Sequence, residues 1–406
     1  MNSNPRLSSF ILPPSSFFMP ATPHIVSQKI SVPFDFPVVF THHVFAPENM
    51  ALLDALCRLG EERRHRVMVY IDSCVAGARP DLQKQIAAYF AAHHDKLELV
   101  GEPQAVPGGE AVKNDFALVQ KMIAEMLGAR LDRHAFVVIV GGGAVLDAVG
   151  FAASLVHRGL RTVRVPTTVL SQNDGGVGVK TGVNFLGGKN AIGTFWPPFA
   201  VIDDFQFLLT LDDRAWLDGV AEAFKVSIIR DAHFFDWLCA QAAKLRSRDF
   251  EAMQQLVIRC AELHLDHIRT AGDPFELGRA RPLDFGHWAA HKLELMSDFK
   301  ISHGEAVAVG MLLDCCYAVK SGWLTEAEFD AIHRGLAASG LPVWFDELER
   351  TRGNTLEIFD GLREFQEHLG GELCVTYPQH IGARHEVHEV DLELMREALA
   401  KLKSLA

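Results

Sequence analysis

Hydrophobic residues in the first half of the chain fall into two alternating patterns. Short continuous apolar runs predict buried strands at residues 66–72, 96–100, 135–140, 162–166 and 200–203. Between them, apolar residues three or four apart predict helices at residues 47–59, 82–94, 112–127 and 144–156. Because strands alternate with helices, the pattern predicts an α/β fold with a doubly wound parallel sheet.

The pattern changes in the second half. After Asp212 strand signals almost vanish, and helical periodicity runs to the C-terminus with one interruption at residues 372–376. We therefore expect a disordered tail rich in Pro, Ser and Phe at residues 1–25, an α/β dinucleotide-binding domain at 26–205, and a mostly α-helical metal- and substrate-binding domain at 206–406. Residues 167–196 are Gly-rich with little periodicity, and long segments without regular structure are usually functional.

Composition narrows the classes of partner. The chain has 406 residues, which favours two domains, and its formal charge of -12 argues against a nucleic-acid partner. No apolar run reaches the roughly 20 residues of a membrane helix, so no membrane span is expected. The seven cysteines are odd in number and form no CxxC pair, which is typical of reduced cytoplasmic thiols. A cytoplasmic enzyme with a small-molecule substrate fits these features.

Three histidines, His287, His291 and His303, lie within seventeen residues. His287 and His291 are four apart, so on a helix they share one face. A single histidine on an apolar face is usually a core residue, but three at this density favour a divalent-metal site. Glu222 would complete a His/His/Glu zinc site, and Asp284, one helical turn before His287, could be a hydrogen-bonding partner of a ligand.

Glu222 and Lys225 are three apart and share a helical face. Such a pair is usually a surface ion pair. The neighbouring residues are Val, Ala and Phe, however, and they favour a buried functional pair.

Gly141, Gly142 and Gly143 close a predicted strand just before a predicted helix. Such glycines let backbone N–H groups approach a pyrophosphate, although a structural turn explains them equally well. Asp72 ends an earlier strand and could bind the hydroxyls of a ribose, or could simply cap a turn.

Positive charge gathers between Arg158 and Asn190. This segment contains Arg158, Arg161, Arg164, Lys180 and Lys189, with Asp174 as its only acid. Lysines flanked by glycines suit the capture of a phosphorylated ligand, and a solvated basic face is the alternative.

In their order along the chain, these segments resemble the 3-dehydroquinate synthase superfamily, the sugar phosphate cyclases, over roughly residues 66–382. The strongest matches are Gly141-Gly142-Gly143-Ala144-Val145-Leu146-Asp147, Pro166-Thr167-Thr168, Asp174 to Lys180, Gly188-Lys189-Asn190, Gly219 to Lys225, Phe285-Gly286-His287 and His303-Gly304-Glu305. The resemblance implies a homodimer that binds NAD, a divalent metal (zinc, with cobalt as the alternative) and a sugar phosphate.

The resemblance also implies roles for individual residues. NAD would be bound by Asp72, Glu110, Lys113, Gly141, Gly142, Gly143, Asp147, Thr167, Thr168, Phe207 and Thr210. The metal would be held by Glu222, His287 and His303. The substrate would be contacted by Asp174, Lys180, Lys189, Asn190, Lys225 and His291, with Arg158 reaching a phosphate across the dimer interface.

The reaction implied by the resemblance is closure of a sugar phosphate to a carbocycle, with transient oxidation by NAD and elimination of phosphate. Four positions depart from the 3-dehydroquinate synthase pattern: Asp284 replaces Asn, Ala290 replaces Gly, Ala280 replaces Arg, and Asp266-His267 stands where a Lys is expected. We therefore expect a non-carboxylated substrate such as sedoheptulose 7-phosphate. The alternatives are a metal-dependent, NAD-linked polyol dehydrogenase like glycerol dehydrogenase, and a binding protein without activity.

Overall fold

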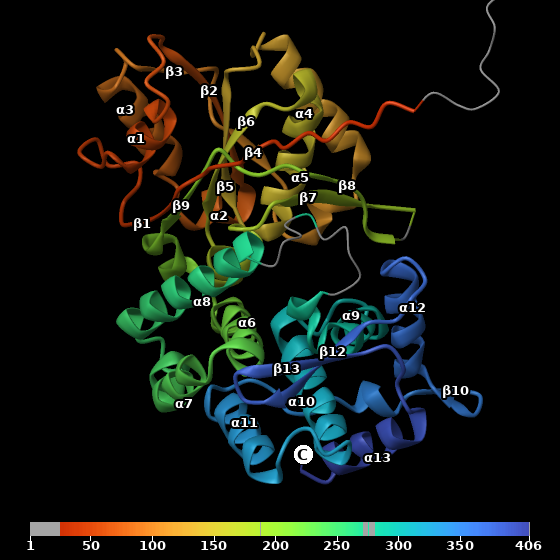
Figure 1. Cartoon of the computed structure of the whole chain (residues 1–406). Helices are drawn as coiled ribbons and strands as arrows, with labels where there is room; N and C mark the ends of the chain where they lie inside the picture. The colour runs from red at the N-terminus through yellow and green to blue at the C-terminus, as the bar shows by residue number, and fades with distance from the viewer. Residues whose placement is uncertain (1–24, 187, 271–274, 276–280, 406) are drawn as a thin grey trace, which may run out of the picture. The chain divides into compact units, whose positions relative to one another are not determined.

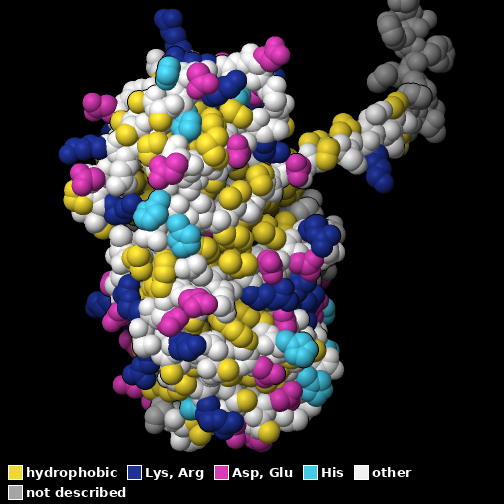
Figure 2. Space-filling model, turned by 90° about the vertical axis from the view of Figure 1, so that its left-hand side faces the viewer, with side chains coloured by type: hydrophobic (Ala, Val, Ile, Leu, Met, Phe, Trp, Pro, Cys, Tyr) yellow, Lys and Arg dark blue, Asp and Glu magenta, His cyan; other side chains and the backbone are white. Residues whose placement is uncertain are grey.

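The computed structural model describes residues 25–186, 188–270, 275 and 281–405. The predicted tail therefore lies outside the described residues, apart from Ile25. The chain divides into two compact units, residues 1–35 and 36–406. In the first unit, residues 25–35 form no helix or strand and expose Ile25, Val26 and Ile30. Figure 2 shows hydrophobic side chains along this segment in yellow. The second unit carries everything described below.

A parallel sheet forms the first part of the second unit (Figure 1). Its strands are β1 (Val38–Thr41), β2 (His65–Asp72), β3 (Leu97–Leu99), β4 (Gln104–Val106), β5 (Phe136–Gly141), β6 (Arg161–Pro166) and β9 (Ala200–Asp204). The strand order is β1-β9-β6-β5-β2-β3, and β4 also pairs with β2. The chain order reverses between β2 and β5, so the switch point of this doubly wound sheet lies at their carboxyl ends.

Helices cover both faces of the sheet, which explains the continuous apolar runs. They are α1 (Ala51–Cys57), α2 (Ser73–Ala78), α3 (Leu82–Ala92), α4 (Phe116–Gly128) and α5 (Gly143–Leu155). Along β2, Val67 and Val69 face the core cluster shared with α1 and α3. Met68 and Tyr70, between and after them, face the cluster shared with α4 and α5. The predicted doubly wound α/β domain is confirmed.

One expectation about this domain was wrong. Residues 167–196 are not devoid of regular structure, because β7 (Lys180–Phe185) and β8 (Gly188–Phe195) form an antiparallel hairpin. Gly150 on α5 lets β7 pass closely, since a Cβ at Gly150 would lie 2.8 Å from Thr181 Cγ2. The many glycines and polar residues in the hairpin hide the alternation that marks a strand.

The second part of the unit is mostly helical, as expected. Its helices are α6 (Asp213–Arg230), α7 (Ala232–Arg246), α8 (Phe250–Thr270), α9 (His287–Met296), α10 (His303–Lys320), α11 (Glu326–Ala338), α12 (Asp360–His368) and α13 (Leu392–Lys403). The buried helix α10 packs against α6, α9, α11 and α13 (Figure 1). Within the described residues, no helix is long and apolar enough to cross a membrane.

The expectation of a single strand-like interruption in this half was also wrong. Two short hairpins interrupt the helices: β10 (Thr351–Arg352) with β11 (Thr355–Leu356), and β12 (Val375–His380) with β13 (Ala383–Val387). Their strands are short or largely exposed on one side, so their apolar pattern is weak.

The start of α9 is fixed by close packing against α10. Gly286 adopts φ 78°, a left-handed conformation that glycine tolerates, and a Cβ at Gly310 would lie 2.2 Å from its carbonyl oxygen. Asp314 of α10 accepts hydrogen bonds from Gly286 N at 3.0 Å and from Trp288 Nε1 at 2.8 Å. At the start of α10, Ser302 and Glu305 form a capping box. These contacts hold the first residues of the two helices side by side.

Candidate active site

Glu222 of α6, His287 at the start of α9 and His303 at the start of α10 converge on one point. Their nearest donor atoms all lie within 4.8 Å of one another. Glu222 Oε1 is 3.7 Å from His287 Nε2 and 3.4 Å from His303 Nε2. Two imidazole nitrogens and a carboxylate oxygen form a donor set that fits a zinc-type ion. The fold therefore brings together the three residues that the sequence analysis selected as metal ligands, although they lie up to 81 positions apart in the chain.

Glu222 and Lys225 form a buried ion pair rather than a surface pair. Burial alone would raise the pKa of Glu222, but Lys225 and His303 hold that pKa below its ordinary value. For Lys225, burial is outweighed by Glu222 and Asp174, which raise the pKa of its ammonium group. At neutral pH the pair is thus a carboxylate beside an ammonium ion.

The two histidines differ in their electrostatic surroundings. Burial and the nearby Lys225 lower the pKa of His287 well below its ordinary value, so its imidazole is neutral, the form that binds metals. Burial opposes protonation of His303 as well, but Glu222 and Glu294 raise its pKa to about 9.

The backbone supplies one partner of His287, since its Nδ1 lies 3.1 Å from the carbonyl oxygen of Phe285. Asp284 is one of several acids that raise the pKa of Lys225, after Glu222 and Asp174. Of the other departures from the family pattern, Ala280 lies outside the described residues.

Asp174 links Lys225 to a histidine that the sequence prediction missed. Asp174 Oδ2 lies 3.5 Å from Lys225 Nζ, and Asp174 Oδ1 lies 3.3 Å from Nε2 of the buried His264. Asp266, at the position where the family pattern has a Lys, pairs with Arg230 at 3.1 Å. His264 is the residue beside the site, and its apolar helical neighbours in α8 made it look like a core residue.

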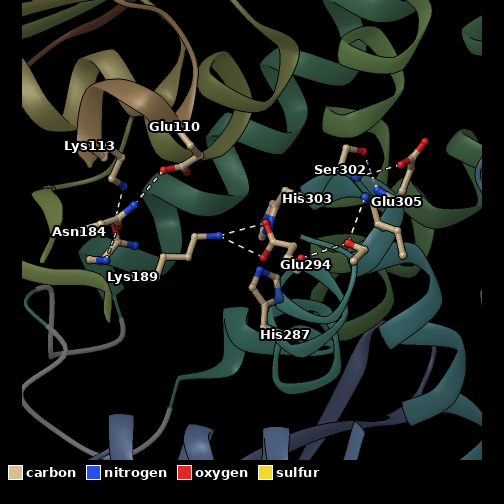
Figure 3. Close-up of polar contacts among 12 residues, drawn as sticks. Glu110, Lys113, Asn184, Lys189, His287, Glu294, Ser302, His303 and Glu305 are labelled. Carbon is tan, nitrogen blue, oxygen red and sulfur yellow. Dashed lines mark hydrogen bonds and ion pairs between the residues drawn. The ribbon is translucent and has the colours of Figure 1, made fainter. Parts of the chain in front are cut away.

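Glu294 was also missed. It lies on α9, buried, between His303 and Lys189 (Figure 3). Its spacing of seven residues from His287 places it on the same helical face. A polar residue in an amphipathic helix usually faces solvent, so Glu294 could not be told from a surface residue by its place in the pattern.

The carboxyl ends of β2, β5 and β6 bring together most of the residues predicted to bind NAD. Asp72 ends β2 and caps α2 by accepting a hydrogen bond from Cys74 N at 2.8 Å. Gly141 ends β5, and a Cβ there would lie 3.1 Å from Asp72 Cβ. Thr167 follows β6 and donates its N–H to the Gly141 carbonyl at 3.1 Å. Beside them, Gly142 and Gly143 start α5, and a Cβ at Gly142 would lie 3.3 Å from Thr168 Cγ2.

A second polar group lies between this edge and the β7–β8 hairpin. Lys113 Nζ is 2.8 Å from Asp147 Oδ2 on α5 and also donates to the side-chain oxygen of Asn190. Glu110 accepts a hydrogen bond from Asn184 at 3.4 Å (Figure 3). The buried ammonium of Lys113 thus joins a predicted NAD residue to a predicted substrate residue.

The remaining predicted residues differ in their distance from the candidate metal site and the carboxyl edge of the sheet. The His291 ring centroid is 5.4 Å from that of His287, and Lys180 begins β7 with an exposed side chain. Phe207 is fully buried in the sheet core, and Thr210 Oγ1 donates to its carbonyl at 2.7 Å. Arg158 precedes β6, so about 20 Å of strand separates it from the carboxyl edge.

Three comparisons relate the chain to known proteins. Family models described as "3-dehydroquinate synthase N-terminal" and "3-dehydroquinate synthase C-terminal" match residues 104–218 and 219–359. The 3-dehydroquinate synthase of Halorhodospira halophila is 34% identical over 324 residues, which are 77% of this chain and 90% of that protein.

Solved structures give the same picture. ValA, the 2-epi-5-epi-valiolone synthase of Streptomyces hygroscopicus subsp. jinggangensis 5008 with NAD+ and Zn2+ bound, superposes with a TM-score of 0.82 and is 31% identical; the match covers 94% of this chain and 100% of ValA. A 2-deoxy-scyllo-inosose synthase, complexed with carbaglucose-6-phosphate, NAD+ and Co2+, has a TM-score of 0.71 at 20% identity, covering 90% and 96% of the two chains. The second likeness shows the shared fold.

Proposed function

The chain belongs to the 3-dehydroquinate synthase superfamily, and from that premise we propose that it is an NAD- and metal-dependent sugar phosphate cyclase that eliminates phosphate. The observation that carries the proposal is the convergence of Glu222, His287 and His303 beside the Lys225–Asp174 ion pair. A protein that kept only the fold would have no need to bury a carboxylate and an ammonium next to two imidazoles. These residues would hold the metal, and the edge formed by Asp72, Gly141–Gly143 and Thr167 would hold NAD.

When bound, NAD+ would accept and return a hydride, and the metal would polarise a substrate alcohol or ketone oxygen. The residues of the chain would bind and orient the substrate. Lys225, charged and fixed between Glu222 and Asp174, can donate to a substrate hydroxyl. Lys180 and Lys189 can bind phosphate oxygens, and the orientation they impose supplies much of the catalytic effect.

Support for a non-carboxylated substrate comes from Asp284. Its charge is close enough to influence Lys225. A substrate carboxylate near Lys225 would be repelled by Asp284, by about 1 kcal/mol or more at short range. ValA, described as a 2-epi-5-epi-valiolone synthase, supports a substrate outside the 3-dehydroquinate reaction. We propose a C7 sugar phosphate such as sedoheptulose 7-phosphate.

The test is incubation of the zinc-loaded protein and NAD+ with a panel of C6 and C7 sugar phosphates. Phosphate release is followed by NMR, and NADH by its absorbance. We expect phosphate release without net NADH, and Glu222→Ala should abolish it together with bound metal. Net growth of NADH would indicate a polyol dehydrogenase instead. Normal turnover of the carboxylated heptulosonate would overturn the substrate assignment, and no bound metal would overturn the function.

A further inference from the structure

Glu294 is placed to act on two residues of the proposed site at once. Its carboxylate reaches elements on either side of α9 (Figure 3). Oε1 lies 3.4 Å from His303 Nδ1 at the start of α10, and the two oxygens lie 3.0 and 3.1 Å from Lys189 Nζ on β8. The side chain is buried, with about 5% of the residue exposed, so these contacts are held in a medium that strengthens them.

The two ring nitrogens of His303 face different carboxylates. Nε2 lies 3.4 Å from Glu222 Oε1, whereas Nδ1 lies 3.4 Å from Glu294 Oε1. An imidazole that binds a metal is neutral and carries one N–H and one lone pair. If the N–H points from Nδ1 to Glu294, the lone pair on Nε2 points to Glu222 and His287. Glu294 therefore favours the tautomer in which His303 can bind a metal between those residues.

Glu294 could itself bind a cation, because it also lies close to the donor atoms of His291 and His303. The contacts of the two carboxylates decide between these roles. Both oxygens of Glu294 are taken by the ammonium of Lys189. Glu222 meets Lys225 through Oε2 and keeps Oε1 directed at two imidazole nitrogens. The cation position beside Glu294 is thus filled by Lys189.

We propose that Glu294 is a positioning residue that fixes His303 for the metal and holds Lys189 of the β7–β8 hairpin next to it. The inference rests on the proposed metal site. Through Glu294, a metal ligand in the helical part and a phosphate-binding lysine in the sheet part share one carboxylate. Lys189 is therefore held beside the proposed metal site before substrate binds. A substrate phosphate must compete with the Glu294 carboxylate for the ammonium group of Lys189.

Cobalt binding tests the first half of the proposal without any substrate. Metal-free protein is titrated with Co2+, and its visible absorbance is recorded for wild type, Glu294→Gln, Glu294→Ala and Lys189→Ala. Glu294→Ala should raise the Kd for Co2+ by about 10–100-fold. Glu294→Gln should have a smaller effect because its amide oxygen can still accept the Nδ1–H. Lys189→Ala should not weaken binding, since it leaves the carboxylate in place.

Lysine reactivity tests the second half. Brief acetylation and mass spectrometry should find Lys189 more reactive in Glu294→Gln than in wild type, because its ammonium loses its charged partner. Thermal unfolding of the metal-free variants shows whether each is folded, and Glu294→Gln carries the test if Glu294→Ala is not.

Each outcome is decisive. Unchanged cobalt affinity in Glu294→Gln and Glu294→Ala would overturn the proposal. Loss of the cobalt spectrum as complete as in Glu222→Ala would make Glu294 a ligand, and would overturn it too. Wild type that binds no cobalt would instead refute the metal site, and with it the proposed function.

Discussion

Asp314 lies on α10 with none of its side chain exposed, and its two oxygens accept hydrogen bonds from Gly286 and Trp288 at the start of α9. Burial raises its pKa from 3.8 to about 8, although both hydrogen bonds act in the opposite direction. Below pH 3.8 the side chain is protonated in both folded and unfolded chains. Between about pH 4 and pH 8 only the folded chain keeps the proton. The stability that protonated Asp314 contributes to the folded chain is therefore lost as pH rises through that window.

We therefore expect the contribution of Asp314 to the free energy of unfolding to fall by up to about 1.4 kcal/mol per pH unit toward pH 8, and to level off above it. Denaturant unfolding of the metal-free protein across this range measures the effect. Asp314→Asn is the matched variant, because it cannot titrate. The difference between wild type and Asp314→Asn should show the slope, and a constant difference at all pH values would contradict the prediction.

At the scale of elements, the contact between α9 and α10 sets the distance between His287 and His303. A Cβ at Gly310 would lie 2.2 Å from the Gly286 carbonyl oxygen and 3.3 Å from Ala290 N. Gly310→Ala should push the helices apart, lower the free energy of unfolding by about 1–3 kcal/mol, and weaken metal binding.

Thermal unfolding and zinc titration check this expectation. Gly128→Ala at the end of α4 is the control, since a Cβ at Gly128 would meet nothing within 4 Å. That change should leave metal binding intact and be neutral or slightly stabilising. Equal stability and equal zinc affinity of the two alanine variants would show that the close approach of α9 and α10 does not determine metal binding.

The elements also show what the sequence could and could not predict. β2 and β5 were predictable because both their faces are buried, so each contains a continuous apolar run. The β7–β8 hairpin was not, because its glycines serve close approaches that exist only in the folded chain. Glu222, His287 and His303 could be selected by residue type and family resemblance. Glu294 and His264 could not, because only tertiary packing turns a polar side chain on a helix toward the site.

At the scale of the whole molecule, Arg158 lies at the opposite edge of the sheet from the proposed metal site. It lines a surface cavity of about 540 Å³ together with Arg130, Arg133 and His157. The family resemblance implies that Arg158 reaches a phosphate in a partner subunit, and a homodimer would make this possible. In that case, each active site takes Lys180 from one subunit and Arg158 from the partner subunit. Arg158→Ala and Lys180→Ala should then each inactivate the homodimer.

Mixing the two inactive variants should then restore activity. A hybrid dimer has one site with both Arg158 and Lys180 intact, so random exchange of subunits should recover about a quarter of wild-type phosphate release. Light scattering gives the oligomeric state in the same samples. A mixture that stays inactive despite subunit exchange, or a monomeric protein, would show that Arg158 does not act across an interface.

Both histidines of the proposed metal site are the first residues of their helices, α9 and α10. The backbone dipoles of a helix add up to roughly half a positive charge at its amino end. Two such ends meet here, and the donor set facing them contains a single carboxylate. An ion held by these residues would be only partly neutralised by its ligands. It would keep more of its positive charge for a substrate oxygen, and the same helix ends would attract an anionic group such as phosphate.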